Sequence, residues 1–303
     1  MTSKCNLRCI YCHREGQSDS SNFRSPMTSE EISKLVDIGG NFGVRAIKAT
    51  GGELLTRQDI IEILQRIASK PFIEDLSIVT NGILLSKFAS DLFENGVNRI
   101  NVSLDTLEPD RYRFLSKGSI SPVLRGITAV TELKFSLLKI NMLILKNFNE
   151  EEFVNMVKFI ETLLHSSMTP IHLQLIELVQ TSVIGNDFFT NYYVNLRETF
   201  RPWLINNSSS RFFRSKNMRE CFTLPSGLVI ELVTPTHNSA FCEHCNRIRI
   251  TFDGYLKPCL MREDNLIDII GPMRLGASSE NLKGLFHKAI SLKSPYWLNH
   301  QNK

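Results

Sequence analysis

Leu76-Ser77-Ile78-Val79-Thr80 and Arg99-Ile100-Asn101-Val102-Ser103-Leu104 are two short apolar runs that enclose a helical pattern at residues 86–94. Runs of this length that are rich in Ile, Val and Leu indicate buried strands, so the segment predicts a strand, a helix and a second strand. The same order is repeated on both sides of it. Further strands are expected at residues 46–50, 138–145 and 171–178, and further helices at 59–68 and 123–133.

Two helices are expected from their start signals. Thr28 with Glu31 and Asn149 with Glu152 have the spacing of a capping box, and each pair precedes a helix-periodic apolar pattern. The repeated strand–helix units predict an α/β fold whose parallel sheet closes, wholly or partly, into a barrel. Functional groups are then expected at the carboxyl ends of the strands.

The strand–helix pattern weakens after Leu178. Residues 180–220 are polar and aromatic-rich, and the triplet 208–210 indicates a loop. We expect a barrel domain at residues 1–223 and a second, α+β domain at residues 224–303.

The composition is ordinary for a globular protein, with 42% hydrophobic and 22% charged residues among 303 and a formal net charge of +4. This charge does not argue for a nucleic-acid partner, and no apolar run is long enough to cross a membrane. The first residues lack the apolar stretch of a signal peptide, which places the chain in the cytoplasm as an expectation. Its seven cysteines then read as reduced thiols or metal ligands rather than a disulfide framework.

The cysteines fall into two trios and one isolated residue. The first trio is Cys5, Cys9 and Cys12, with the spacing C-x3-C-x2-C, and the second trio is Cys242, Cys245 and Cys259, with the spacing C-x2-C-x13-C. Iron–sulfur cubanes usually take four cysteines, so three would leave one iron open to a substrate or cofactor. Zinc is the alternative, with His13 as fourth ligand of the first trio and His244 or His237 as that of the second. Cys221 is expected to be a buried thiol.

Three groups of polar residues stand where the expected strands end. Gly51-Gly52-Glu53 offers close backbone approach to a ligand and a carboxylate for an ammonium group. Thr80 and Ser103 lie at the ends of the next two strands, where turns and strand-end caps are the simpler explanation.

Residues 246–251 follow the second trio and alternate as in a strand, with Arg247 and Arg249 on one face. Two guanidinium groups beside an open metal site suit an anionic ligand such as a triphosphate. An exposed basic edge is the other interpretation.

The first trio, with Tyr11 before its third cysteine, resembles the signature of the radical S-adenosylmethionine (SAM) superfamily. The resemblance implies a [4Fe–4S] cluster on Cys5, Cys9 and Cys12, with SAM bound to its open iron. One electron cleaves SAM and yields a 5′-deoxyadenosyl radical. The residues that the resemblance assigns to SAM are Tyr11, Gly51, Gly52, Glu53 and Ser103.

Together with the second trio and Arg247 and Arg249, the whole chain resembles the GTP 3′,8-cyclases of molybdenum cofactor biosynthesis (the MoaA type). This implies a partial (β/α)6 TIM-type barrel and a C-terminal domain that carries a second [4Fe–4S] cluster. GTP would bind between the clusters, lose a ribose 3′ hydrogen to the radical and close onto guanine C8, giving 3′,8-cyclo-GTP. The residues assigned to GTP are Lys48, Thr80, Lys139, Arg247 and Arg249, and both arginines are expected to act with the first trio in catalysis.

The resemblance also implies partners: reduced flavodoxin or ferredoxin as the electron donor, and a cyclic pyranopterin synthase that uses the product. A homodimer is compatible with it. Lys48 stands where the family usually has an arginine, and Gln174 and Val179 replace an arginine and a methionine. The chain also begins without the family's arginine ahead of the first cysteine, which leads us to expect a start site set too far downstream or a truncated fragment, and it ends without the usual Gly-Gly pair.

Two other functions compete with the cyclase. The first is a radical SAM enzyme that modifies peptides and carries one auxiliary cluster, for which the Arg247 and Arg249 pair has no evident use. The second is a zinc-stabilised binding module or an inactive paralogue.

Overall fold

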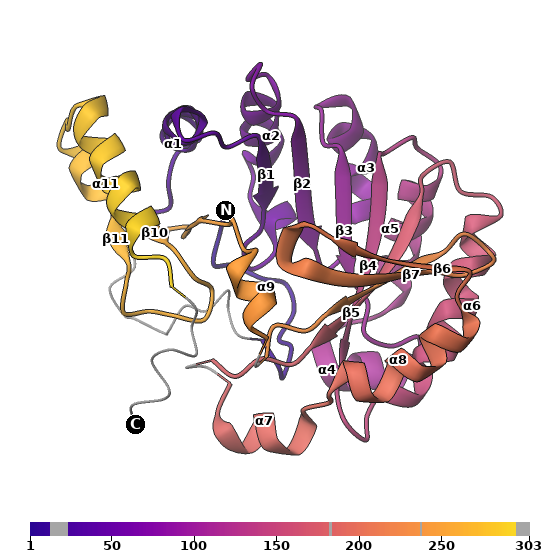
Figure 1. Ribbon diagram of the computed structural model, residues 1–303. Coiled ribbons are helices and arrows are strands. Elements are labelled where there is room, and N and C mark those ends of the chain that lie inside the picture. Colours follow the sequence, from indigo (N-terminus) through magenta and orange to yellow (C-terminus); the bar gives the residue numbers. More distant parts are fainter. Residues whose placement is uncertain (13–23, 182–183, 237, 295–303) are drawn as a thin grey trace.

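The computed structural model describes residues 1–12, 24–181, 184–236 and 238–294, and an eight-stranded sheet is its centre (Figure 1). The spatial order of the strands is β1-β2-β3-β4-β5-β8-β7-β6. Their bounds are β1 (Ala46–Ala49), β2 (Asp75–Thr80), β3 (Arg99–Ser103), β4 (Leu137–Ile144), β5 (Ile171–Glu177), β6 (Ser210–Arg214), β7 (Arg219–Thr223) and β8 (Val229–Val233).

Six of these strands are parallel. Strands β1 to β5 lie side by side in chain order and are all parallel, and β8 runs parallel to β5. Strand β7 pairs with β8, and β6 with β7, both antiparallel. The sheet has β1 and β6 at its edges and is therefore an open barrel rather than a closed one. The expected partial (β/α)6 barrel is confirmed, and so are all five expected strands.

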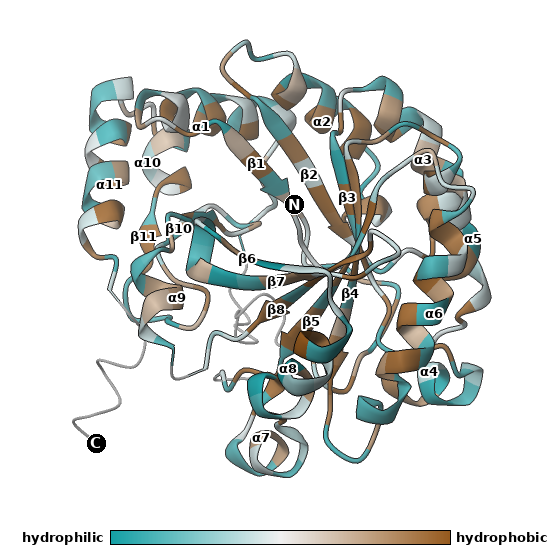
Figure 2. Ribbon diagram, turned by 45° about the vertical axis from the view of Figure 1, so that its right-hand side comes forward, coloured by the Kyte–Doolittle hydropathy of each residue, from teal (hydrophilic) through white to brown (hydrophobic). Residues whose placement is uncertain are grey.

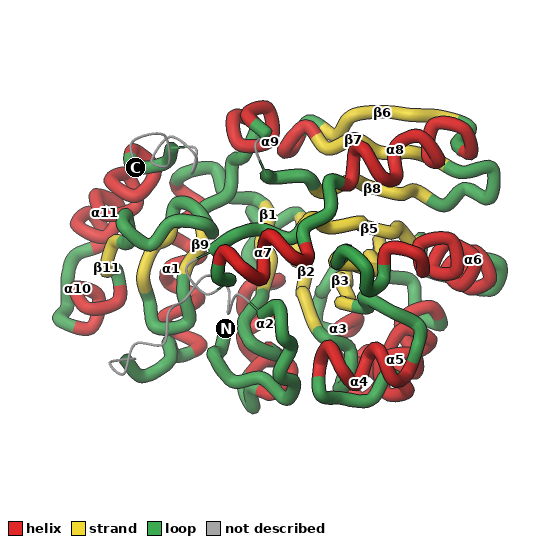
Figure 3. The backbone as a smooth tube through the Cα atoms, turned by 90° about the horizontal axis from the view of Figure 1, so that it is seen from below, coloured by secondary structure: helices red, strands yellow, loops and turns green. Residues whose placement is uncertain are grey.

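Helices cover the outer side of the strands (Figure 3). The helices of the barrel are α1 (Ser29–Asn41), α2 (Ile60–Ala68), α3 (Leu85–Glu94), α4 (Pro109–Ser116), α5 (Ser121–Thr131), α6 (Phe153–Leu164), α7 (Asn186–Tyr192) and α8 (Leu196–Asn207). Strand residues such as Ile78, Ile100 and Ile140 are fully buried in one apolar core with residues of these helices. Figure 2 shows hydrophobic colouring both on the central strands and on the helices around them. The segment at 180–220, where the strand–helix pattern weakens, contains α7, α8 and β6. The loop predicted at 208–210 is found at Ser208 and Ser209, and Ser210 already begins β6.

The two predicted capping boxes have different outcomes. At α1 the box is present, because the Thr28 hydroxyl accepts from Glu31 N at 3.2 Å and the Glu31 carboxylate accepts from Thr28 N at 2.8 Å. At α6 it is wrong: Asn149 precedes a 3-10 turn at Glu150–Glu152, and the helix begins only at Phe153. Asn149 and Glu152 are instead buried and bind the chain that follows β3, where Asn149 donates to Asp105 O at 2.7 Å.

A smaller unit follows the barrel on one side of it (Figure 1). It has a three-stranded sheet in the order β11-β10-β9 and three helices. Its elements are α9 (Ser239–Glu243), β9 (Arg249–Ile250), β10 (Tyr255–Lys257), β11 (Ile267–Asp268), α10 (Ile270–Arg274) and α11 (Ser279–Ser291). The unit docks on α1 through Arg274, which binds Glu31 at 2.7 Å, and through Phe286, whose ring stacks on Phe42.

The predicted domain boundary at residue 223 falls inside the main sheet, because β7 ends there and β8 lies between β5 and β7. The expected strand over 246–251 is also shorter than predicted, since only Arg249 and Ile250 form β9. No helix in the described ranges is both long and apolar enough to span a membrane.

Candidate functional site

Polar residues line the side of the sheet that faces away from the helices. Ser103, Asn141, Gln174 and Glu231 are lateral register partners on β3, β4, β5 and β8, and Asn101 and Lys139 are partners one row below. Lateral partners in a sheet point to the same face. The strands therefore alternate between an apolar outer face and a polar inner face, and the inner face is the candidate site.

The first cysteine loop is fastened to the carboxyl end of β1. The Met1 ammonium donates to Thr50 O at 2.8 Å, Gly52 N donates to Thr2 O at 2.7 Å, and Glu53 N donates to Lys4 O at 2.7 Å. A Cβ atom added to Gly52 would lie 2.2 Å from Lys4 O, so this position requires glycine. The glycines were expected to let a ligand approach the backbone closely, but here residues Thr2 and Lys4 of the chain itself occupy that space.

The three thiols of this loop lie within electrostatic range of one another. Burial, followed by the charges of Asp105 and Cys12, raises the pKa of Cys9 to about 12, and burial, Glu53 and Cys12 raise that of Cys5. Leu7 N and the Asn81 amide donate to the Cys5 sulfur at 3.4 and 3.9 Å. The raised pKa values mean that negative charge on these crowded thiols is unfavourable without a cation nearby. A cationic iron centre fits such a site, because a coordinated metal deprotonates its thiols outright.

Tyr11 fixes the far end of the loop. Its hydroxyl donates a hydrogen bond to Asp105, and the other oxygen of Asp105 accepts from Leu143 N at 2.8 Å. Burial raises the pKa of Asp105 to about 6, although both of these hydrogen bonds oppose the shift. The Tyr11 ring packs with Leu115, Leu145 and Leu178 in a small apolar cluster at the ends of β4 and β5.

Glu53 and Thr80 lie elsewhere than the sequence led us to expect. The Glu53 side chain is fully buried and accepts from Leu55 N, the Thr80 hydroxyl and Asn81 N, at 3.1, 2.8 and 2.7 Å. It has no exposed surface to offer the SAM amino group, and in this structure it ties the end of β1 to the end of β2. Thr80 is the register partner of Val102 and so lies on the helix-covered face, apart from Lys48 and Lys139.

Three of the other expected GTP residues do come together. Burial and then the charges of Arg247 and Lys139 lower the pKa of Lys48 well below its usual value, which means that the three cations share one region. The Lys48 ammonium donates to Asn101 Oδ1 at 3.3 Å. Burial, Arg219 and Arg249 lower the pKa of Arg247 to about 10. Such a concentration of positive charge suits a polyanionic ligand.

A buried carboxylate that sequence reasoning missed organises part of this charge. Glu231 accepts from Lys139 at 2.5 Å, Gln174 at 2.5 Å, Arg214 at 2.7 Å and Arg219 at 2.9 Å, and we call these five residues the Glu231 cluster. Lys139 is 5% exposed and is therefore buried, not a solvated lysine at the end of its strand. A signal was present in the sequence, since Glu231 interrupts the apolar run of β8 and a charge in such a strand needs a buried partner.

The second trio stands beside the inner face. Cys245 follows α9, and its pKa is lowered in spite of burial by Arg247 N, by the Lys293 ammonium 3.7 Å from the sulfur, and by the Asn217 amide. Asn217 is fully buried in the left-handed conformation, with φ of 63°, and its Oδ1 has no hydrogen-bond partner in the part of the chain that the structure describes. Donors directed at a thiolate fit a metal-bound sulfur.

No three His, Cys, Asp or Glu side chains of the described residues are close enough to bind a single metal ion. Each cysteine of an iron–sulfur cubane binds a different iron, so its sulfurs need not approach as closely as the ligands of one zinc ion. His244, a candidate zinc ligand, has its Nδ1 at 3.0 Å from Ala240 O. The other two candidates, His13 and His237, and the C-terminal residues 299–303 lie outside the described residues.

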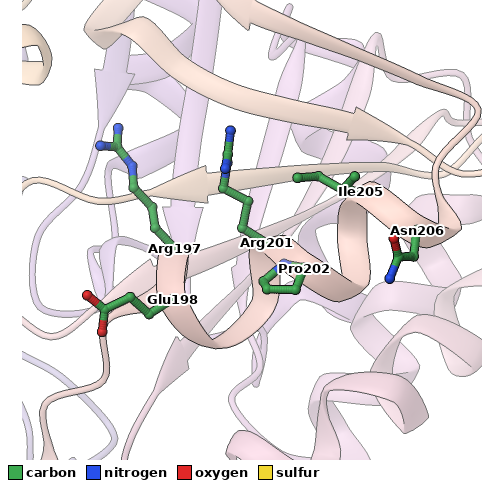
Figure 4. Close-up of a pocket in the computed structure, with 6 residues that line it drawn as sticks. All are labelled: Arg197, Glu198, Arg201, Pro202, Ile205 and Asn206. Carbon is green, nitrogen blue, oxygen red and sulfur yellow. The ribbon is translucent and has the colours of Figure 1, made fainter.

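Two surface hollows of about 330 and 460 Å³ lie on the opposite face, beside α8. Figure 4 shows that Arg197 and Arg201 point to the same side of this helix and that Glu198 points away. None of the expected site residues lines either hollow, so the candidate site is defined by the inner face of the sheet and not by these hollows.

Comparison with known proteins divides the chain into two matched regions. Residues 1–160 match the family described as Radical SAM superfamily, and residues 171–298 match that described as Molybdenum Cofactor Synthesis C.

Curated relatives match along the whole length. A protein of Pyrococcus horikoshii named "Probable GTP 3',8-cyclase" is 38% identical over 309 residues, which cover 100% of this chain and 95% of the relative. One of Methanocaldococcus jannaschii with the same name is 39% identical, over 98% of this chain and 94% of the relative. Among solved structures, Streptococcus suis SuiB bound to S-adenosylmethionine shares the fold with a TM-score of 0.54 and 17% identity, over 85% of this chain and 56% of that one.

Proposed function

The chain belongs to the radical SAM superfamily and, along its whole length, to the GTP 3′,8-cyclase family within it, and from this premise we propose how its residues divide the reaction. The activity is that of an enzyme of molybdenum cofactor biosynthesis that converts GTP to 3′,8-cyclo-GTP. The proposal depends on one observation: Lys48 and Lys139 lie on the inner face of the sheet, where Lys48 donates to Asn101, the register partner of Lys139, and the charge of Arg247 lowers the pKa of Lys48.

Cys5, Cys9 and Cys12 hold a [4Fe–4S] cluster with one open iron for SAM. When bound, the cluster and SAM supply the one-electron chemistry and the carbon radical that removes a hydrogen atom from the substrate. The chain's part is to hold the loop still. Backbone hydrogen bonds to Thr2 and Lys4 fix its start, and the Tyr11–Asp105 contact fixes its end.

Gly51, Gly52 and Ser103 are proposed to line SAM. Because the Glu53 carboxylate is buried in hydrogen bonds to the chain, contact with the SAM amino group falls to the backbone of the two glycines. Ser103 ends β3 on the inner face, half-buried, where its hydroxyl can hydrogen-bond a ligand.

Cys242, Cys245 and Cys259 are proposed to hold the second [4Fe–4S] cluster, which would offer an open coordination position to the nucleotide. Lys48, Lys139 and Arg247 bind the nucleotide by charge and hydrogen bonds, and Arg249 adds to the positive potential around Arg247. Held between the two clusters, GTP would have its ribose toward SAM. Orientation of this kind is the chain's main contribution to the rate.

Three further parts of the proposal concern partners. A small reduced electron-transfer protein, flavodoxin or ferredoxin, would deliver the electron to the first cluster. A cyclic pyranopterin synthase would use the product, and a homodimer is compatible with the family.

The test is an incubation of the anaerobically reconstituted protein with SAM, dithionite and GTP. We expect 5′-deoxyadenosine and 3′,8-cyclo-GTP to form together. Cys9→Ala should abolish both products, and Arg249→Ala should reduce cyclisation while slow, uncoupled SAM cleavage remains. Deoxyadenosine formation that is indifferent to GTP would contradict the assignment.

The two competing functions make different predictions in the same assay. A peptide-modifying enzyme would need a peptide rather than GTP to stimulate SAM cleavage. A zinc-stabilised module would purify colourless with stoichiometric zinc. The match of residues 171–298 to the molybdenum cofactor family favours the cyclase over both.

A further inference from the structure

The guanidinium of Arg219 lies close to the residues proposed to bind GTP. Its Nη1 donates to Glu231 at 2.9 Å, which places it in the Glu231 cluster with Lys139. Its charge also lowers the pKa of Arg247 and of Lys48. The same guanidinium lies 5.5 Å from the centre of the Phe241 ring, and Phe241 belongs to α9 and precedes Cys242.

Arg219 points to the inner face of the sheet. Cys221 is the register partner of Glu231, and Arg219 stands two residues before it on β7, so the three side chains share one face. The carboxylate of Glu220, between them in sequence, points to the other face and binds Arg201 and Arg211 on the α8 side.

This face carries unused hydrogen-bonding capacity. Among the described residues, Arg219 Nε and Asn141 Oδ1 are buried and have no hydrogen-bond partner. Asn141 is the register partner of Gln174, which itself binds Glu231. Buried polar atoms are nearly always paired, so orphans on one face indicate a site that a ligand completes.

The charges of the Glu231 cluster do not balance. Lys139, Arg214 and Arg219 bring three positive charges to a single carboxylate that is 1% exposed. Burial by itself would raise the pKa of Glu231, but these three cations outweigh it and lower the pKa, so the carboxylate stays ionised. Two positive charges remain for an external anion.

We propose that Arg219 and Arg214 bind the triphosphate of the nucleotide together with Lys139, and that Glu231 is the positioning residue that holds the three cations on the inner face. The inference rests on the proposed function, because it takes GTP as the ligand. It adds two cations from the antiparallel strands β6 and β7 to those on the parallel strands. The predicted recognition is of phosphate oxygens and not of the guanine base.

The direct test compares GTP with guanosine, which has no phosphate, as ligands of the reconstituted protein. In Arg219→Gln we expect the Kd for GTP to rise about 10- to 100-fold, the effect of losing a charged hydrogen bond, and the Kd for guanosine to stay unchanged. Arg219→Lys should recover part of the loss. Arg214→Gln, at a side chain that is 32% exposed, provides a second variant with little structural role. Arg201→Gln, which removes a partner of the buried Glu220 on the outer face, is the matched control and should change neither Kd.

Glu231 is tested by thermal unfolding with and without GTP. Glu231→Gln should lower Tm, because the buried Lys139 and Arg219 and the half-buried Arg214 lose their counter-charge. GTP should raise Tm by more than it does in the wild type, because phosphate oxygens replace that charge. Glu220→Gln should lower Tm without a larger GTP-induced shift, since its arginines, Arg201 on α8 and Arg211 on β6, lie on the outer side of the sheet.

The inference would be overturned by an Arg219→Gln variant that binds GTP as tightly as the wild type does. It would also be overturned if the variant's affinities for GTP and for guanosine fell by the same factor. An equal GTP-induced shift in Glu231→Gln and Glu220→Gln would also count against it. A wild-type protein that binds guanosine no more weakly than GTP would overturn the triphosphate site while leaving the cyclase assignment intact. A wild-type protein that binds neither ligand would overturn the proposed function first.

Discussion

The Tyr11 hydroxyl donates its hydrogen bond to Asp105, a residue 94 positions further along the chain that comes just after β3. Asp105 also accepts from Leu143 N on β4. One buried carboxylate therefore joins the first cysteine loop to two strands of the barrel. The loop has no regular secondary structure of its own, so its geometry depends on contacts of this kind.

Removal of this contact should loosen the loop. In Tyr11→Phe the buried Asp105 loses a donor, which costs about 1–3 kcal/mol of folding free energy. We expect reconstituted Tyr11→Phe to lose the cluster of the first trio faster in air than the wild type, measured as the decay of absorption near 400 nm. Tyr192→Phe, at another tyrosine of the same apolar cluster, is the control. Equal decay in both variants would show that the Tyr11 hydroxyl does not hold the loop.

Gly52 should not tolerate a side chain. Its Cβ would meet the backbone of Lys4 at 2.2 Å, and backbone cannot move aside as a flexible side chain can. Gly52→Ala should therefore displace residues 1–4 and lower both Tm and the iron content.

The matched substitution is Gly284→Ala, inside α11, where an added Cβ meets nothing within 4 Å. Alanine favours a helix interior over glycine by about 1 kcal/mol, so this variant should be slightly more stable than the wild type. A Gly52→Ala protein with wild-type Tm and iron content would contradict the close packing described above.

The cysteines offer a test of the second cluster by iron counting. Cys245→Ala should reduce the iron content of the reconstituted protein from about eight to about four atoms per chain, because one [4Fe–4S] cluster is lost. Cys221→Ala should leave it unchanged, since Cys221 is 1% exposed on β7 and its sulfur lies 3.8 Å from Arg219 O. Wild-type protein with about four irons, or no loss in Cys245→Ala, would argue against the second cluster.

The affinity for GTP should fall above pH 8. Burial lowers the pKa of Lys139 to about 8, with Glu231 opposing the shift, so Lys139 is charged at pH 7 and becomes neutral above pH 8. Its charged fraction then falls about tenfold for each further pH unit, and the phosphate loses a partner. Binding isotherms between pH 7 and 9.5 should show this decline in the wild type and a weaker one in Lys139→Arg, which stays charged.

The contribution of Lys139 to folding stability should rise with pH, whereas its contribution to GTP affinity falls. A lysine in the unfolded chain has a pKa of about 10.4, so between pH 8 and 10.4 the unfolded state binds more protons than the folded one. Stability contributed by this group therefore rises with pH in that window. The difference in Tm between wild type and Lys139→Arg, followed from pH 7.5 to 10, should shift in favour of the wild type. A constant difference would mean that Lys139 is not buried as described.

The sequence by itself determined the fold class and the groups of residues that carry the chemistry. Periodicity located all five predicted parallel strands, because an apolar run must be buried whatever lies opposite to it. The cysteine spacings are local, and they identified the two trios and the family. Where a side chain can serve either its own helix or a distant segment, as at Asn149 and Glu152, local pattern predicted the wrong partner.

Only the tertiary structure decided which face and which partner each polar side chain has. Glu53 and Thr80 bind each other behind the sheet, whereas Lys139 and Glu231, 92 residues apart, meet on its inner face. Successive side chains of a strand point to opposite faces of the sheet, so an error of one residue in the register moves inner side chains to the outer face. The pairing of β8 with β5 also cannot be deduced from the sequence of either strand alone. The pairing of buried charges is a property of the assembled sheet, and for that reason the partners of Glu231 are known only from the structure.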